Sequence, residues 1–253
     1  MAAGSPARGF LVRGLLVGVA AGLAAFVVAY VLGEPGVRDA IGVEEAAAQA
    51  AGGHAHEEAL VSRSVQSTLG LGTAMLGFGA SFGGLFGLAF AVAYGRLGSL
   101  GARATAAVLA VVGFVAISLV PFVKYPANPP AVGDPETIGR RTSLYFLMLV
   151  LSLLFVAAAT YLARRLPLGT WDRVLAGGGA YLVLVVAGMA VMPQVNEVGS
   201  AFPPTVLWSF RAGSLATLLT VWLVLGVLYG LLTERAEARG RAPAAYRTVA
   251  THP

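Results

Sequence analysis

Charged side chains are scarce in this chain of 253 residues, since Asp, Glu, Lys and Arg make up only 11% of it. A water-soluble domain carries about 25% charge. Hydrophobic residues instead make up 57%, and they come in blocks of about 20, the length that a helix needs to cross a hydrocarbon core of about 30 Å. The composition excludes a disordered chain, a collagen, a coiled coil and a nucleic-acid-binding domain, and it indicates a multi-span membrane protein.

Cysteine is absent, and the three histidines are His54, His56 and His252. Without thiols there is no disulfide, no thiolate zinc site and no iron-sulfur cluster. No hydrophobic block contains histidine, which excludes the paired haem ligands of a membrane cytochrome and the base that a nucleophilic serine needs. We therefore expect no enzyme and no permanently bound cofactor.

The hydrophobic blocks predict six membrane-spanning helices, because backbone groups in lipid must be hydrogen-bonded within a helix. A membrane barrel would show segments of about ten residues that alternate in polarity, and no block does. The fold class is therefore all-α, a polytopic helix bundle that occupies residues 1–232. The predicted spans are residues 14–32, 69–94, 104–123, 143–163, 174–192 and 212–232.

The basic residues predict the direction of the spans. Eleven of the seventeen Lys and Arg residues lie on the side of the two termini, whereas nine of the twelve acidic residues lie on the other side. Lys and Arg favour the cytoplasmic side of a membrane. We therefore expect both termini in the cytoplasm, an acidic outer face, and a basic cytoplasmic tail at 233–253 that is disordered beyond one or two helical turns.

Two of the spans carry glycine at every fourth position. Stacked small residues let two helix backbones approach closely, which is how helices associate in lipid. We expect these two spans to pack tightly, against each other or against a partner. The glycines are Gly14, Gly18 and Gly22 in the first span and Gly79, Gly83 and Gly87 in the second.

The first outer loop, residues 33–68, is acidic and contains His54, His56, Glu57 and Glu58. Residues two apart share a side of an extended segment, and residues four apart share a face of a helix. Imidazole nitrogen together with carboxylate oxygen suits divalent first-row cations such as cobalt, nickel or zinc. These four residues are the candidate metal ligands, and a solvated polar loop is the alternative.

Further polar residues lie near the outer ends of the predicted spans, several of them in proline-rich connections. Ionisable groups that face the interior of a bundle typically mark a pathway, although groups at this level can also be simply hydrated. The candidates for lining an outward vestibule are Glu34, Asn128, Asp134, Glu136, Asn196 and Glu197.

Several segments along nearly the whole chain resemble the predicted cobalt transporter subunit CbtA family. The proline-rich string is the most specific of them. The segments are Phe10-Leu11-Val12-Arg13-Gly14-Leu15-Leu16, Gly33-Glu34-Pro35, Val61-Ser62-Arg63-Ser64-Val65-Gln66-Ser67-Thr68, Ala91-Val92-Ala93-Tyr94-Gly95-Arg96, Lys124-Tyr125-Pro126-Ala127-Asn128-Pro129-Pro130 and Val195-Asn196-Glu197-Val198.

The resemblance implies a multi-pass protein of the bacterial inner membrane that supplies cobalt for cobalamin biosynthesis. It also implies a small, single-span, histidine-bearing partner of the CbtB type. On this hypothesis the acidic outer loop captures Co²⁺ as the transported ion, and the helices pass it inward. The alternative is a non-transporting scaffold or assembly subunit that binds another membrane protein through its glycine-lined helices. Beyond the lipid bilayer we expect no nucleic-acid partner, and a homo-oligomer is left open.

Overall fold

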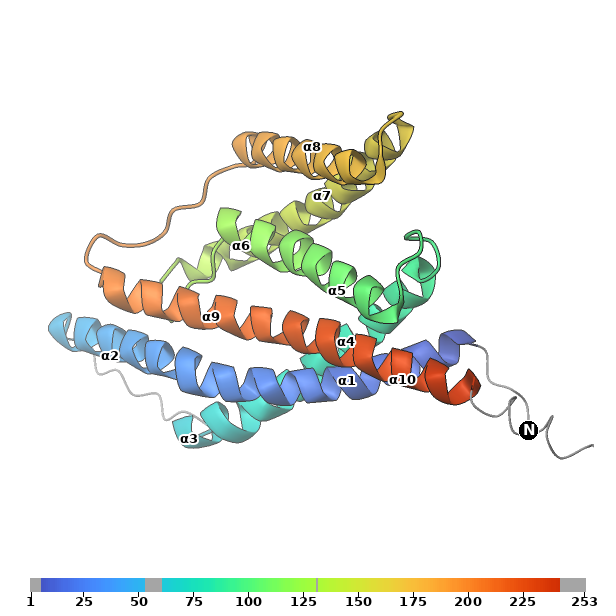
Figure 1. Ribbon diagram of the computed structural model, residues 1–253. Helices are drawn as coiled ribbons and strands as arrows, with labels where there is room; N and C mark the ends of the chain where they lie inside the picture. Colours follow the sequence, from blue (N-terminus) through green and yellow to red (C-terminus); the bar gives the residue numbers. More distant parts are fainter. Residues whose placement is uncertain (1–5, 53–60, 131, 242–253) are drawn as a thin grey trace, which may run out of the picture. The chain divides into compact units, whose positions relative to one another are not determined.

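The computed structural model describes residues 6–52, 61–130 and 132–241, and these residues form helices with no strand among them (Figure 1). Six helical stretches in this described part are long and apolar enough to cross a membrane. The predicted all-α membrane fold is confirmed. The six stretches are Ala7–Ala50, Arg63–Ala93, Ala102–Lys124, Pro135–Arg165, Thr170–Val191 and Pro204–Arg239.

Most of these stretches are built from more than one helical element. Segments of π-helix interrupt four of them, and a short 3₁₀ turn, η4, opens another. In chain order the elements are α1 (Pro6–Val28), η1 (Ala29–Gly33), α2 (Glu34–Ala50), α3 (Arg63–Val65), η2 (Gln66–Gly70), α4 (Leu71–Ala93), α5 (Ala102–Gly113), η3 (Phe114–Leu119), α6 (Val120–Lys124), η4 (Pro135–Thr137), α7 (Ile138–Arg165), α8 (Thr170–Val191), α9 (Pro204–Val224), η5 (Leu225–Tyr229) and α10 (Gly230–Arg241).

The first helix is longer than the sequence predicted. Instead of ending near Leu32, it continues through η1 into α2 and ends at Ala50, so the first part of the predicted outer loop is helical. Pro35 lies in the first turn of α2, where proline is tolerated. The rest of α2 is rich in alanine, the strongest helix former. At the other end of the chain α10 also continues as helix to Arg241.

The π-helical segment η3 has a local cause in the sequence. Pro121 lies in the first turn of α6, directly after η3. A proline inside a helix lacks a backbone N–H, and its ring clashes with the carbonyl four residues earlier. A π turn places the hydrogen bond one residue further back and relieves this clash. The third span therefore remains helical across its proline.

The chain forms two compact units. Unit 1 consists of Met1–Val31, Glu58–Val112 and Ala216–Pro253, and unit 2 consists of Leu32–Glu57 and Gly113–Leu215. Each unit therefore combines segments that lie far apart in the sequence.

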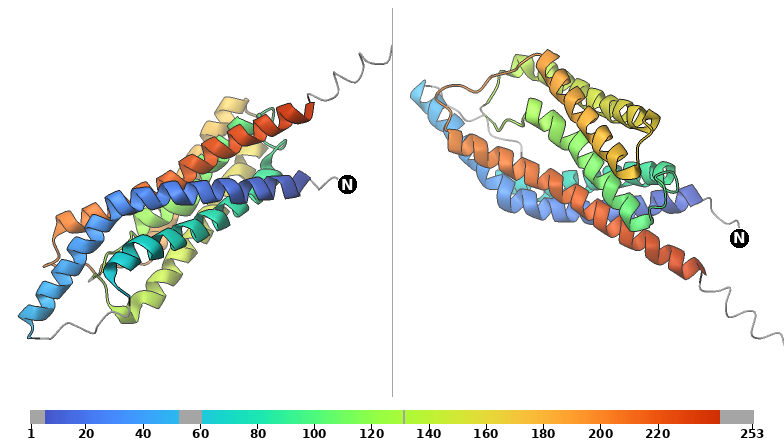
Figure 2. Two further views of the ribbon diagram at one scale, coloured as in Figure 1. Left: turned by 90° about the horizontal axis from the view of Figure 1, so that it is seen from below. Right: turned by 45° about the horizontal axis from the view of Figure 1, so that its top comes forward.

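In unit 1, α1 and α4 pack backbone against backbone and lie side by side in Figure 2. A Cβ on Gly14 would overlap the carbonyl of Gly83, and one on Gly18 would overlap the carbonyl of Gly79. On the α4 side, a Cβ on Gly79 would stand 2.7 Å from the backbone nitrogen of Gly22. Side chains larger than hydrogen are therefore excluded along both rows.

The end of unit 1 near Phe10 combines aromatic packing with polar contacts. The Tyr229 ring lies 4.9 Å from that of Phe90, and its hydroxyl donates a hydrogen bond of 3.1 Å to the Phe10 carbonyl. Arg13 donates to the Thr233 hydroxyl at 3.1 Å. At this end α1 is therefore hydrogen-bonded to both η5 and α10.

In unit 2, α7 and α8 form an antiparallel hairpin, visible as a pair in Figures 1 and 2. Ser152 and Tyr181 share a hydrogen bond of 2.8 Å across it. Gly188 makes room for the Phe155 ring, because a Cβ there would lie 2.7 Å from it. Met148, which is fully buried, and Val185 form the adjoining core.

A second core of unit 2 joins α2 to the start of α9. Ala40, Val132 and Phe202 are buried together there. A Cβ on Gly36 would stand 3.1 Å from the backbone of Phe210, and one on Gly213 would stand 2.9 Å from Gly33. The helix that follows the first span is thus held against α9 by close backbone contacts.

Candidate functional site: the proline-rich connections of unit 2

The candidate metal ligands His54, His56, Glu57 and Glu58 lie outside the described residues. The six candidate vestibule residues are all described, and they belong to unit 2. They lie at the start of α2, in η4 and in the two proline-rich connections, 125–134 and 192–203. Most of the candidates are therefore in or directly beside these two connections.

The first connection begins by capping the end of α8. Pro193 has no N–H, so the Met189 carbonyl, four residues earlier, loses its helical partner. The Lys124 ammonium group donates to this carbonyl at 2.8 Å, and the Tyr125 hydroxyl donates to the Pro193 carbonyl at 2.7 Å. Burial raises the pKa of Tyr125, partly opposed by the Arg140 charge, so the phenol stays a neutral donor at physiological pH.

The same connection is held to α9 by Arg211. Its Nε donates to the Ala127 carbonyl at 3.2 Å, and its Nη2 donates to Asn128 Oδ1 at 3.0 Å. Pro126 and Pro129 flank the Ala127-Asn128 dipeptide and restrict its backbone. The Arg211 guanidinium adds two hydrogen bonds to this restricted segment. The Asn128 oxygen is therefore already engaged.

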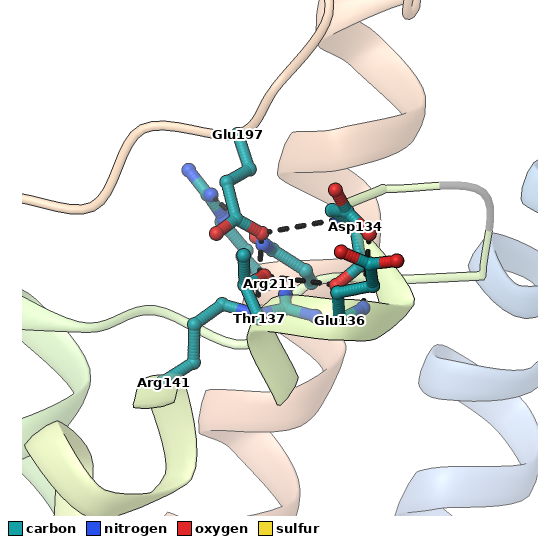
Figure 3. Close-up of polar contacts among 7 residues, drawn as sticks. Asp134, Glu136, Thr137, Arg141, Glu197 and Arg211 are labelled. Carbon is teal, nitrogen blue, oxygen red and sulfur yellow. Dashed lines mark hydrogen bonds and ion pairs between the residues drawn. The ribbon is translucent and has the colours of Figure 1, made fainter. Parts of the chain in front are cut away.

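The second connection is held to the first through Glu197 (Figure 3). Glu197 Oε2 lies 3.2 Å from Arg141 Nε and accepts a hydrogen bond of 3.3 Å from the Asp134 backbone N–H. Gly133 precedes this N–H and has a φ of +101°. A Cβ at this glycine would stand 2.8 Å from Glu197 Oε2 and would overlap the Arg141 guanidinium. The ion pair therefore requires glycine at position 133.

Asp134 caps the short turn η4. Its Oδ1 accepts from the Glu136 backbone N–H at 2.9 Å, and its carbonyl accepts from the Thr137 hydroxyl at 2.8 Å. This is the preferred role of aspartate at the start of a helical turn. The Glu136 side chain is exposed beside it.

Glu34 and Asn196 differ in their surroundings. Glu34 opens α2 and is only 6% exposed, and its Oε1 lies 3.9 Å from Arg38 Nε, one helical turn later. Asn196 is exposed in the second connection. Glu34 is thus the most deeply buried carboxylate among these candidates.

Taken together, these contacts form a brace across the two connections. It consists of Lys124, Tyr125, Asn128, Arg141, Glu197 and Arg211. Cationic and phenolic donors in it satisfy carbonyl and carboxylate acceptors across the two connections, and hydrogen bonds that involve a charged group are the stronger kind. Within residues 6–52, 61–130 and 132–241 no group of three or more His, Asp or Glu side chains is placed to hold a metal ion. The contacts hold the two proline-rich connections in place.

The sequence did not predict that four side chains hold the two connections in place. They are Lys124, Tyr125, Arg141 and Arg211. A signal existed for Lys124, because Pro193 close to the end of a span leaves a carbonyl in need of a donor. No such signal existed for Arg141 or Arg211. Their partners are distant in the chain, 83 residues away for Arg211 and Asn128, and a long-range pairing leaves no trace in local composition.

A comparison with protein families gives the identity of the chain. The model of the family described as "Probable cobalt transporter subunit (CbtA)" matches residues 7–234. The chain belongs to the CbtA family. Neither the curated proteins nor the solved structures contain a match. A CbtA chain with six membrane-crossing stretches is a multi-pass membrane protein of a cobalt transporter family.

Proposed function

We propose that this CbtA chain is the multi-span subunit of a Co²⁺ uptake system in a bacterial inner membrane. The observation that carries the proposal is the family match over residues 7–234. Capture takes place on the outer segment that contains His54, His56, Glu57 and Glu58, where neutral imidazole and carboxylate groups replace part of the ion's water shell.

The described part of α2 supports this role for the segment. Gly36 and Ala40 bind α2 to the start of α9 and to the proline-rich connections through the second core of unit 2. The chain enters the capture segment just after Ala50, the last residue of α2. In this proposal α2 is a fixed support from which the ligands are presented.

The polar outer residues divide into two groups in this proposal. Asn128, Asp134 and Glu197 hold the connections in place, because their oxygens already accept hydrogen bonds or an ion pair. By position we assign three further residues to the entry path as oxygen donors: Glu136 and Asn196, whose side chains are exposed, and Glu34, whose carboxylate lies beside Arg38.

The membrane potential supplies a driving force for inward movement. A potential of 100 mV, negative inside, is worth about 2.3 kcal/mol per unit charge, and therefore roughly twice that for a divalent cation. Uptake then requires no nucleotide hydrolysis by this chain. A small single-span subunit of the CbtB type, with histidines of its own, is the partner we propose for ion transfer.

The glycine rows offer little support for the alternative, a scaffold that binds another protein. The Gly14 and Gly83 rows face each other within unit 1, so their surfaces are already occupied. A partner would have to bind elsewhere. Transport therefore remains the function that the observations favour.

The test is uptake of radioactive ⁵⁷Co²⁺ by cells that lack other cobalt importers, with this chain alone and with its partner. Replacing His54 and His56 together by alanine should lower uptake at limiting Co²⁺ about tenfold or more. His252→Ala, in the tail, is the matched control and should leave uptake unchanged. Absence of uptake in every combination would exclude transport, whereas full uptake by the double variant would exclude only these ligands.

The pH dependence gives a second readout of the same ligands. Imidazole must be deprotonated to bind a metal ion, and its usual pKa is about 6.5. Uptake through His54 and His56 should therefore fall as the outside pH drops through about 6.5. A profile that stays flat down to about pH 5 would assign capture to the carboxylates.

A further inference from the structure

The turn that joins α7 to α8 gathers three arginines at one end of the hairpin. Arg164 and Arg165 end α7, and Arg173 lies in the first turn of α8. The turn itself is short, because α8 begins at Thr170. A Cβ on Gly177 would stand 3.3 Å from Ala163, so the two helices are in contact at the residue before Arg164 and one helical turn after Arg173.

Two of these arginines are held in place by neutral groups. Arg165 Nη2 donates to the Tyr161 hydroxyl at 2.8 Å, and its guanidinium lies 5.0 Å from the centre of that ring. Arg173 Nη2 donates to the Leu168 carbonyl at 2.9 Å. Arg164 is exposed. The side chains are therefore oriented without losing their charge to a carboxylate.

The positive charge of the turn is uncompensated by ion pairs. Among the described residues, Arg103 pairs with Glu234 and Arg141 pairs with Glu197, whereas no carboxylate lies within ion-pair distance of the three arginines of the turn. Asp172 is the one acidic residue between Arg164 and Arg173. The turn thus offers several guanidinium donors to an anion.

Apolar and aromatic groups show at which depth the anion would lie. Trp171 is 71% exposed and Tyr161 58% exposed, and Leu166 and Leu168 are exposed beside them. Tryptophan and tyrosine gather at the level of the lipid headgroups. Exposed leucines favour the acyl chains, while the arginines must stay with the polar groups. Both demands are met at the boundary of the bilayer.

We propose that the α7–α8 turn binds the phosphodiester headgroup of an anionic phospholipid through Arg164, Arg165 and Arg173. The planar guanidinium matches phosphate geometry with two parallel hydrogen bonds. A basic residue near an anionic membrane surface strengthens binding by about fivefold. The Trp171 and Tyr161 rings flank the headgroup, and the leucines contact its acyl chains. This site is independent of the proposed transport function.

The experiment counts lipids that remain on the purified full chain. Native mass spectrometry of detergent-solubilised protein, titrated with phosphatidylglycerol or with phosphatidylcholine, should show at least one tightly retained phosphatidylglycerol and no equivalent phosphatidylcholine. The variant R164Q/R165Q/R173Q should lose this lipid, with half-saturation at a concentration about tenfold higher or more. R164K/R165K/R173K keeps the charge and should bind more weakly than the wild type but better than the Gln variant.

The matched control is R96Q/R235Q/R239Q, which removes the same charge from other elements and should retain the lipid. Several outcomes would overturn the proposal. They are equal lipid retention by the two Gln variants, equal retention of phosphatidylcholine, and displacement of the lipid by millimolar inorganic phosphate, which would make the site one for free anions. If the triple Gln variant does not fold, R164Q alone is titrated, and unchanged half-saturation overturns the proposal.

Discussion

Single polar side chains hold the proline-rich connections of unit 2. Lys124 replaces the N–H that Pro193 cannot supply, and the Glu197 carboxylate joins Arg141 to the Asp134 backbone. Composition and position predicted that these residues lie outside the hydrocarbon core. The sequence could not show that most of them are already bonded to one another, because each bond joins segments more than 50 residues apart.

Replacing Gly133 by alanine should destabilise the protein. The backbone φ of +101° is unfavourable for any residue with a Cβ, and the new methyl group would displace the Arg141–Glu197 pair. A strained conformation of this kind costs about 1–3 kcal/mol. The midpoint of thermal unfolding in detergent should drop by several degrees. Gly199→Ala, with no neighbour within 4 Å of its Cβ, is the control, and equal midpoints for the two variants would contradict this interpretation.

Replacing Lys124 by methionine should loosen the end of α8. The variant keeps the length of the side chain but leaves the Met189 carbonyl without its donor. Loss of a donor to a partly buried acceptor costs about 1–3 kcal/mol. Chemical denaturation followed by tryptophan fluorescence measures the loss. Arg140→Met, which removes an exposed charge nearby, should change stability far less, and a larger effect there would assign the loss to charge alone.

At the scale of helices, hydrophobic length predicted the number of helices that can cross a membrane, because lipid imposes one length and one kind of hydrogen bonding on all of them. It did not predict α2. This segment is too polar for a span, yet its alanines and its lack of an internal proline after Pro35 favour helix. The π-helical segments were also missed, since a shift of one hydrogen bond changes neither length nor composition.

A valine at Gly83 should disrupt unit 1. Its Cβ would stand 2.5 Å from the Cα of Gly18, in the backbone of a rigid helix that cannot yield locally. Overpacking against backbone of this kind costs about 3 kcal/mol or more. We expect loss of the monodisperse peak in size-exclusion chromatography and a lower unfolding midpoint. Gly77→Val changes the same helix where nothing lies within 4 Å of a Cβ, and it should behave as the wild type. Failure of both variants would show that the loss does not come from packing against α1, because valine is no worse a helix former than glycine.

At the scale of the whole chain, the excess of Lys and Arg on the side of the termini predicts the direction of every span. The described residues contain six helices that could cross a membrane, as predicted. The direction in which each span crosses is a separate property, and a labelling experiment measures it. The assignment of the capture segment likewise rests on the chemistry of its side chains. Physical reasoning from composition is strong where the membrane constrains the chain and weak where ligands come together from a loop.

The absence of cysteine makes the direction of the spans easy to test. Single cysteines at Glu45 in α2 and at Asp172 in the first turn of α8 should be accessible from opposite sides of the membrane. We expect a membrane-impermeant maleimide to label Glu45→Cys in intact cells and Asp172→Cys only after the membrane is opened. The unsubstituted chain should show no labelling. The reverse pattern would place both termini outside and would remove the acidic outer face from the proposal.

The close contact between α1 and α4 has a consequence for how the protein is made. The glycine row of α4 ends at Gly87, which lies against Phe10. Both rows have therefore been translated when more than half of the chain is still to come. Membrane helices insert first and associate afterwards, and a lone α1 would present a strip of bare backbone to lipid. The nascent chain can bury that strip as soon as its second span has entered the bilayer, and every later span is then added to a pair that has already formed.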